Sequence, residues 1–157
     1  MYRNEDEALN RAQLRSRWLV LGGAALALLT LTLVSFLLRW PEAVTVLLSS
    51  ALLAACIFGY SMFIAPVAVY GKHIDHALHG KTRETAGVFA GMEAEAVERD
   101  GLRFYPMSLN VGATLKDNGD RLFYYDANLP RPDWREGENL VLTSYDNRVT
   151  DWRRAAQ

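Results

Sequence analysis

The sequence has 157 residues, half of them hydrophobic, and a formal net charge of −1 at pH 7. This length suffices for one ordinary domain, or for a membrane hairpin followed by a very small one. The near-zero charge excludes a global field that would attract nucleic acid or anionic lipid. The single cysteine, Cys56, excludes an internal disulfide and a multi-cysteine metal site.

Residues 1–17 are predicted to form a cytoplasmic, amphipathic lead-in to a first membrane span. Asn4 can cap a short helix here, and the carboxylates that follow it suit the positive end of a helix dipole. Glu7 can pair with Arg11 one turn later. We expect the arginines of this segment to reach lipid phosphates. The alternative interpretation is a helix that docks a partner.

Two apolar runs within residues 18–70 predict a transmembrane helical hairpin. The first span covers residues 19–38, about 20 uncharged residues, which crosses a core of roughly 30 Å at ~1.5 Å per residue. The second covers residues 43–66, and its apolar run continues beyond the length that a bilayer needs. Pro66 is expected to kink this helix near its exit. The predicted residues at the membrane interface are Trp18, Arg39, Trp40 and Tyr70.

The basic residues predict the orientation of the hairpin. Four arginines precede the first span and three basic residues follow the second, whereas the connecting turn holds only Arg39. The positive-inside rule therefore places both termini and the C-terminal domain in the cytoplasm. A cleaved signal peptide is disfavoured by the acidic leading segment and by the lack of a small-x-small site after Leu38. We expect an integral protein of the bacterial cytoplasmic membrane.

Small residues recur every four positions along both spans. Spacing of this kind lets helix backbones approach closely, and packing drives helix association in lipid. It predicts either the seam of the hairpin or a contact between two copies, although Gly and Ala are also simply common in spans. Neither span carries a charged side chain, which disfavours a transporter or channel. The predicted helix-packing residues are Gly23, Ala27, Ala51, Ala55 and Gly59.

Residues 71–81 are predicted to form a juxtamembrane helical linker, which Gly80 is well placed to end. The linker holds all three histidines, His73, His76 and His79, spaced so that neighbours share a helix face. Together with Asp75, His73 and His76 are the predicted ligands of a divalent metal, or the groups of a pH sensor. The alternative is that these histidines are ordinary weakly basic surface residues.

From residue 82 to residue 157 the pattern changes to short β runs separated by turn residues. Asp100-Gly101 is the strongest hairpin signal, and further turns are predicted at 117–120 and at Asp146-Asn147. Six strands are predicted, over residues 84–92, 93–99, 102–111, 121–126, 139–145 and 148–152.

Six strands without a helix between them predict a small antiparallel β-barrel, SH3-like or OB-like, so the fold class is an α+β membrane protein. The connection 112–120 is too short for the helix that an OB barrel usually carries between its third and fourth strands, which favours an SH3-like or truncated OB barrel. Gly87 and Gly91 are expected to mark bends or bulges. The predicted core is Val88, Phe89, Leu102, Phe104, Leu122, Tyr124, Leu140, Leu142 and Val149, with Trp134 over one end.

A membrane hairpin followed by a small barrel is similar in architecture to the bacterial NfeD-type proteins. The resemblance concerns architecture alone, because the glycine-rich strand pattern of their OB region is not found in this sequence. It therefore implies no role for any single residue.

The barrel region carries few signs of chemistry. It holds no histidine or cysteine, so Ser108, Thr143 and Ser144 lack an activating base in it. Carboxylates outnumber basic residues there, which disfavours nucleic-acid binding, and nucleotide-binding and zinc-hydrolase motifs are absent. We expect no enzymatic activity and no cofactor. The predicted function is a membrane-anchored module that binds a protein partner or a second copy, as in an accessory subunit. The alternative is a metal or pH sensor that uses the histidine cluster.

Overall fold

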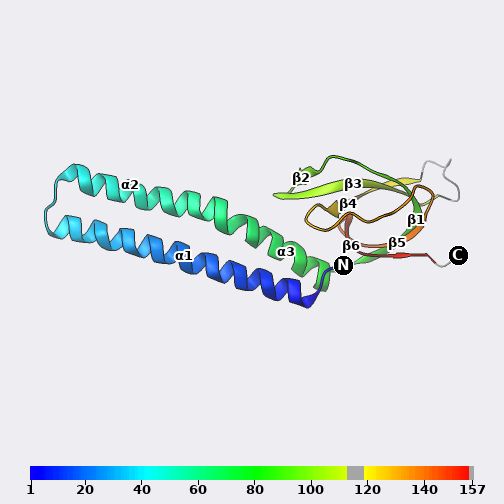
Figure 1. The fold of residues 1–157 in the computed structure, drawn as a ribbon, viewed down its shortest axis with the longest axis horizontal. Coiled ribbons are helices and arrows are strands. Elements are labelled where there is room, and N and C mark those ends of the chain that lie inside the picture. The colour runs from blue at the N-terminus through cyan, green and yellow to red at the C-terminus, as the bar shows by residue number, and fades with distance from the viewer. Residues whose placement is uncertain (113–118, 156–157) are drawn as a thin grey trace. The chain divides into compact units, whose positions relative to one another are not determined.

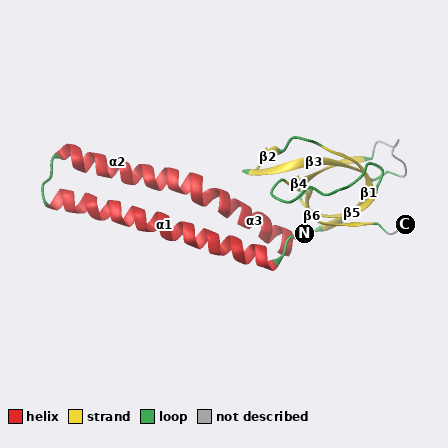
Figure 2. Cartoon of the chain, viewed as in Figure 1, coloured by secondary structure: helices red, strands yellow, loops and turns green. Residues whose placement is uncertain are grey.

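The structure is a computed structural model that describes residues 1–112 and 119–155. The fold is α+β, with two long apolar helices followed by a six-stranded mixed sheet in the described residues (Figures 1 and 2). The chain divides into two compact units. We call Glu7–Gly71 the helical unit, and Met1–Asp6 with Lys72–Gln157 the β unit.

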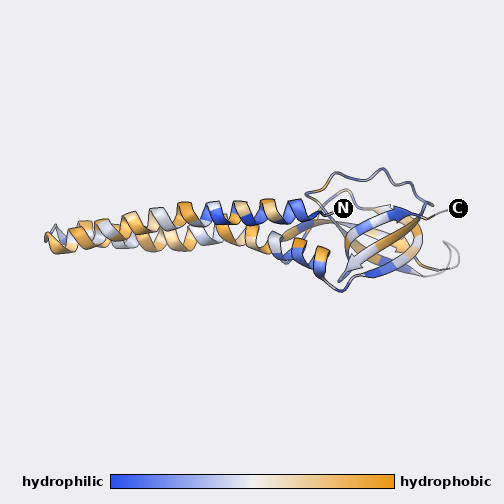
Figure 3. Ribbon diagram, turned by 90° about the horizontal axis from the view of Figure 1, so that it is seen from below, coloured by the Kyte–Doolittle hydropathy of each residue, from blue (hydrophilic) through white to orange (hydrophobic). Residues whose placement is uncertain are grey.

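The helical unit consists of an antiparallel pair of helices (Figure 1). Helix α1 spans Asn4–Leu37, so the predicted lead-in and first span form one continuous helix. The second helix comprises α2 (Glu42–Gly59), a π-helical turn η1 (Tyr60–Ile64) and α3 (Ala65–His79), whose last turns belong to the β unit. Both helices are long and apolar enough to cross a membrane. Figure 3 shows that hydrophobic residues dominate both helices, apart from the polar first turns of α1 and the last turns of α3.

The π turn keeps the inner face of the second helix in line with α1. Along α2 the inward residues follow steps of three and four as far as Gly59, as two packed helices require. From Gly59 the next buried residue is Ile64, five positions on, and Val67 follows three later. The π turn thus inserts one residue into the repeat. It ends two residues before Pro66, where the sequence predicts a kink because proline lacks the N–H of the helix ladder.

The predicted helix-packing residues fall into two groups. A Cβ added at Gly59 would collide with the Leu21 side chain of α1, so this glycine allows a close approach within the hairpin. Ala55 lies one turn away and is half-buried. A Cβ added at Gly23 would meet nothing within 4 Å. The remaining two positions are exposed, namely Ala27 and Ala51.

The six strands of the β unit pair in the order β1-β5-β6-β4-β3-β2, and β1 also pairs with β3. Their bounds are β1 Arg83–Met92, β2 Val97–Arg99, β3 Leu102–Asn110, β4 Asp120–Asp126, β5 Asn139–Tyr145 and β6 Arg148–Arg154.

The prediction of a wholly antiparallel sheet is wrong at one place, because β4 pairs with β6 in parallel. Strands β4 and β6 are each the second strand of an antiparallel pair, β3–β4 and β5–β6. Strand β1 is antiparallel to both β3 and β5, so β3 and β5 run the same way, and their partners β4 and β6 therefore run the same way as each other. The backbone N–H of Tyr124 donates to the carbonyl of Asn147 at this junction, at 2.8 Å.

The predicted turns are largely confirmed. Asp100-Gly101 joins β2 to β3 with φ of 54° and 76°, and Asp146-Asn147 joins β5 to β6 with φ of 48° and 61°. Left-handed conformations of this kind match the twist of a tight hairpin. The register of β1 shifts beside Gly91, as expected of a bulge, whereas Gly87 keeps regular pairing with β5. The turn predicted at 117–120 begins with Asp117 and Asn118, which lie outside the described residues.

The core prediction is right for Phe89 and for β5 and β6, whereas Val88 is only partly buried. The predicted Leu102 and Phe104 of β3 are buried outside the cluster that contains Phe89.

On β4 the prediction chose the wrong face. Leu122 is 46% exposed and Tyr124 is only partly buried, whereas Phe123 and Tyr125 point into the core. Both faces of β4 carry apolar or aromatic residues, so alternation alone does not fix which face is inside. Trp134 packs against the core as predicted. The core cluster is Phe89, Met107, Leu109, Phe123, Tyr125, Leu140, Leu142 and Val149.

The burial of Leu142 predicts how the sheet responds to truncation. Leu142→Ala removes a fully buried side chain from the core, and we expect it to cost about 2–5 kcal/mol of unfolding free energy. The matched change Leu122→Ala, on the exposed face, should cost far less. Chemical denaturation of the full chain in detergent, followed by tryptophan fluorescence, measures both. Equal losses would contradict the assignment of the inner face.

The different surroundings of Gly59 and Gly23 predict different effects of a leucine at each position on thermal stability. Gly59→Leu should lower the thermal unfolding midpoint in detergent, because the new side chain collides with Leu21. Gly23→Leu should leave the midpoint of the hairpin unchanged, because its side chain enters open space. If Gly23→Leu instead changes the mass of the particle in detergent, Gly23 lies in a contact between copies.

Candidate functional site

The histidine linker contributes a buried side chain to the β unit. The last turns of α3 present Ile74 and His73 to the interior, and only 3% of His73 is exposed. The imidazole contacts the edge of the Phe104 ring, with centroids 5.4 Å apart. Phe104 is itself fully buried. This packing places His73 in the interior of the unit rather than on the predicted solvated helix face.

A polar network surrounds His73. The hydroxyl of Tyr2 donates to Asp126 Oδ2 at 2.7 Å and lies 2.9 Å from His73 Nε2. A phenol has one proton, so when Asp126 accepts it the imidazole donates from Nε2. Asp126, at the end of β4, is 1% exposed and also accepts from the backbone and side-chain amides of Asn128. The network thereby ties the N-terminal residues of the β unit to its sheet.

Electrostatics keep this imidazole neutral. Burial lowers the pKa of His73 from 6.5 to about 4, since the protonated form is poorly solvated. Asp126 opposes this shift, while Arg148 and His76 add to it. Arg148 lies over the Phe104 ring and pairs with Asp100. A neutral, enclosed imidazole that already holds a hydrogen bond serves as a structural support.

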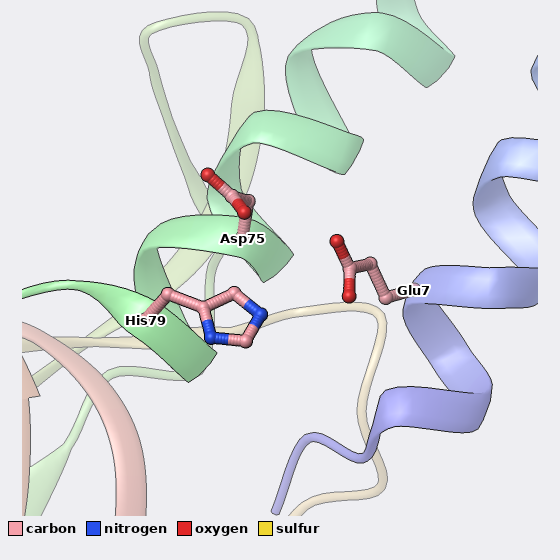
Figure 4. Close-up of side chains that lie close together, drawn as sticks. All are labelled: Glu7, Asp75 and His79. Atoms are coloured by element: carbon pink, nitrogen blue, oxygen red, sulfur yellow. The ribbon is translucent and has the colours of Figure 1, made fainter.

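The other predicted metal ligands lie elsewhere on the linker. His76 is exposed and stacks on Tyr145, with ring centroids 5.0 Å apart. Asp75 is exposed and projects from the same side of α3 as His79, one turn later, as Figure 4 shows. Among the described residues, His73, His76 and Asp75 do not bring three ligand atoms within 4.8 Å of one another. The set predicted from spacing is therefore dispersed over the linker.

The hydroxyls of Ser144, Thr150 and Tyr125 donate to backbone carbonyls. Ser144 Oγ donates to the Arg83 carbonyl at 3.4 Å, and Thr150 Oγ1 donates to the Thr143 carbonyl at 3.1 Å. Both contacts belong to the strand framework. Tyr125 likewise donates to the Pro130 carbonyl at 2.9 Å, and burial raises the pKa of its phenol. None of these groups is hydrogen-bonded to a base in the contacts described.

The helical unit contains a second site, where Arg17 faces the π turn. The Arg17 guanidinium donates from Nη1 to the Phe63 carbonyl at 2.7 Å. Next to it, the rings of Trp18 and Tyr60 lie 6.2 Å apart. At the other end of the hairpin, the hydroxyls of Ser35 and Thr45 are 2.7 Å apart. These contacts fix which residues of the two helices stand opposite each other.

The remaining predicted interface residues lie at the turn of the hairpin and on α3. Arg39 adopts φ of 51° in the turn, and Trp40 beside it is 43% exposed. Tyr70 is half-buried on α3. Sequence reasoning did not identify Tyr2 or Asp126 as partners of His73, because residues 2, 73 and 126 share no motif and meet only through the fold.

Comparisons with protein-family models, with curated proteins and with solved structures find no match.

The buried His73 predicts a specific dependence of stability on pH. Between pH 6.5 and about 4 the unfolded state binds a proton at His73 that the folded state does not, so this group lowers stability as the pH falls through that range. The shift corresponds to a loss on the order of 3 kcal/mol. Thermal unfolding of the full chain in detergent at pH 7.5 and pH 4.5 measures it. His73→Gln should reduce the difference between the two midpoints.

His79→Gln is the matched control, since His79 is exposed on the same helix. It should retain the wild-type difference between the two pH values. An unchanged difference in His73→Gln would show that the acid sensitivity arises from other groups.

Proposed function

We propose that this protein is a membrane-anchored, non-enzymatic module that binds another protein, as an accessory subunit of a larger membrane complex does. The observation that carries the proposal is the outward placement of apolar side chains on the hairpin. Only 6% and 17% of the most apolar 18-residue windows of the two helices are buried. A core helix of a water-soluble domain would be mostly covered. Side chains such as Leu26 and Leu53 are instead more than 60% exposed.

The contacts between the helices support a position for the membrane boundary. Trp18 and Tyr60 stand opposite each other, and paired aromatic rings of this kind suit the headgroup level. The second span then runs from about residue 43 to residue 60, and Tyr70 lies about 15 Å beyond it at 1.5 Å per residue. The positive-inside rule places this end of the hairpin in the cytoplasm, together with both termini and the β unit.

The strand pairings support an OB-like barrel rather than an SH3-like one. The pairings form a ring, β1-β3-β4-β6-β5-β1, with β2 attached to β3. A ring that includes one parallel contact fits the five-stranded Greek-key order of an OB barrel. In that order the connection between the third and fourth barrel strands is residues 127–138, which contains no helix, and not the connection 112–120. These pairings support a barrel of a helix-free OB type.

One face of the β unit supports a protein contact. Val97 pairs with Phe104, and Leu122 pairs with Ser108, two positions of β3 that share a face. Val97 is 38% exposed and Leu122 is 46% exposed, and Tyr124 on the same face is half-buried. Strand β2 has a hydrogen-bonded neighbour on one side only among the described strands. An apolar face beside an open strand edge suits a partner that adds a strand.

The alternative of a pH sensor receives no support from His73, which stays neutral above about pH 4. The alternative of a metal sensor stays a prediction, with Asp75 and the exposed histidines as its groups.

Affinity purification of the full chain from native membranes in mild detergent, after cross-linking, tests the proposal. We expect one partner at a fixed ratio with the wild type, and its loss with Leu122→Glu, which puts a charge on the apolar face. Arg135→Glu, an exposed change in the loop before β5, is the matched control and should retain the partner. Recovery of only the bare chain with the wild type would contradict the proposal.

A further inference from the structure

A groove runs along one side of the helical unit, between α1 and the second helix. Its volume is about 470 Å³. The residues that line it are Ser16, Arg17, Val20, Leu21 and Ala24 of α1, together with Ala55, Phe58, Gly59 and Phe63 opposite. The Leu21 side chain occupies the space beside Gly59, and two aromatic side chains of the second helix, Phe58 and Phe63, line the groove. The groove is thus apolar along most of its length.

Arg17 is the single charged residue in the lining, and it stands at one end. Its hydrogen bond to the Phe63 carbonyl uses one of the five N–H groups of the guanidinium and holds it in place. No acidic residue lines the groove, so the positive charge has no counterion there. A planar guanidinium with N–H groups to spare matches the geometry of a phosphate.

The position of Arg17 next to the aromatic pair indicates how deep each end of the groove lies in the proposed membrane. Arg17 precedes Trp18, which faces Tyr60 at the proposed membrane boundary. From Arg17 the groove extends to Ala24, seven residues or about 10 Å further along α1. One end therefore lies at the level of lipid headgroups and the other at the level of acyl chains.

We propose that this groove binds one anionic phospholipid of the cytoplasmic leaflet, with its phosphate on Arg17 and an acyl chain between the helices. The proposal rests on the membrane anchoring proposed above. A cation at one end of an apolar slot is complementary to an amphiphile with an anionic head, and the cytoplasmic leaflet is rich in such lipids. A second copy fits less well, since the acidic residues of its helical unit are Glu7, about 15 Å from the level of Arg17 along α1, and Glu42, beside the turn at the far end of the hairpin.

Native mass spectrometry of the full chain in a nonionic detergent tests this site. The probes are dioleoyl phosphatidylglycerol and dioleoyl phosphatidylcholine, added separately, and inorganic phosphate as a headgroup without a chain. We expect one phosphatidylglycerol retained per chain, at about tenfold lower lipid concentration than phosphatidylcholine. Inorganic phosphate should neither bind nor displace the lipid.

Three variants locate the lipid. Arg17→Gln should abolish the preference for phosphatidylglycerol, and Arg17→Lys should keep it in part. Arg15→Gln, which removes an exposed arginine of the same helix outside the groove, should keep it fully. Ala24→Phe fills the apolar part of the groove without touching Arg17 and should weaken retention of both lipids.

Equal retention of the two lipids, or equal loss with Arg15→Gln and Arg17→Gln, would overturn the site. Displacement by inorganic phosphate would also overturn it, by indicating a plain anion site. These outcomes leave the anchoring intact as long as the chain sediments with membranes that have been washed at alkaline pH. Release of the chain by that wash would instead contradict the anchoring itself.

Discussion

The apolar outer surface of α1 and α2 is the constraint on which the rest of the structure depends. Each side chain exposed there would cost about 25 cal/mol per Å² of apolar area in water. A helix satisfies its backbone hydrogen bonds internally, so its apolar surface can contact lipid hydrocarbon without leaving polar groups unpaired. The hairpin needs no covering domain once it lies in a bilayer. The β unit buries a core of its own.

The faces of the two helices that pack against each other are selected by contacts other than hydrophobicity. Both faces are apolar, so hydrophobicity does not select which one turns inward, and close packing and a few polar contacts do. Gly59 lets α2 approach Leu21. The hydroxyl pair of Ser35 and Thr45 joins the helices near the turn, and the contact of Arg17 with Phe63 joins them at the other end. The π turn keeps the inward positions in register beyond Gly59.

Composition and local patterns predicted most of the elements. Twenty uncharged residues predict a helix long enough to cross a membrane, and Asp-Gly and Asp-Asn predict hairpins because both adopt positive φ. The inward face of β4 escaped prediction because Leu122, Phe123, Tyr124 and Tyr125 form an unbroken apolar run. The parallel contact of β4 with β6 depends on how two hairpins meet, which no local pattern records.

For the predicted sites, too, the sequence indicated which residues share an element but not which residues they contact in the fold. Spacing placed the histidines on one linker helix, but it could not show that His73 is buried on Tyr2 and Phe104. It identified Ala55 and Gly59 as packing positions yet gave equal weight to Gly23, which faces open space. The Arg17 groove brings together Arg17 and Phe63, which are 46 residues apart in sequence. Their alignment follows from how the two helices pack.

The accessibility of Cys56 tests the central claim, that the hairpin lies within a bilayer. The thiol is exposed on α2 and is the single cysteine of the chain, so in water a charged maleimide would reach it. In membrane fragments open on both sides we predict no labelling until the membrane is dissolved in hot SDS. Glu42→Cys combined with Cys56→Ala, at the turn, should label at once. Labelling of Cys56 in intact membranes at the rate of that control would contradict the account.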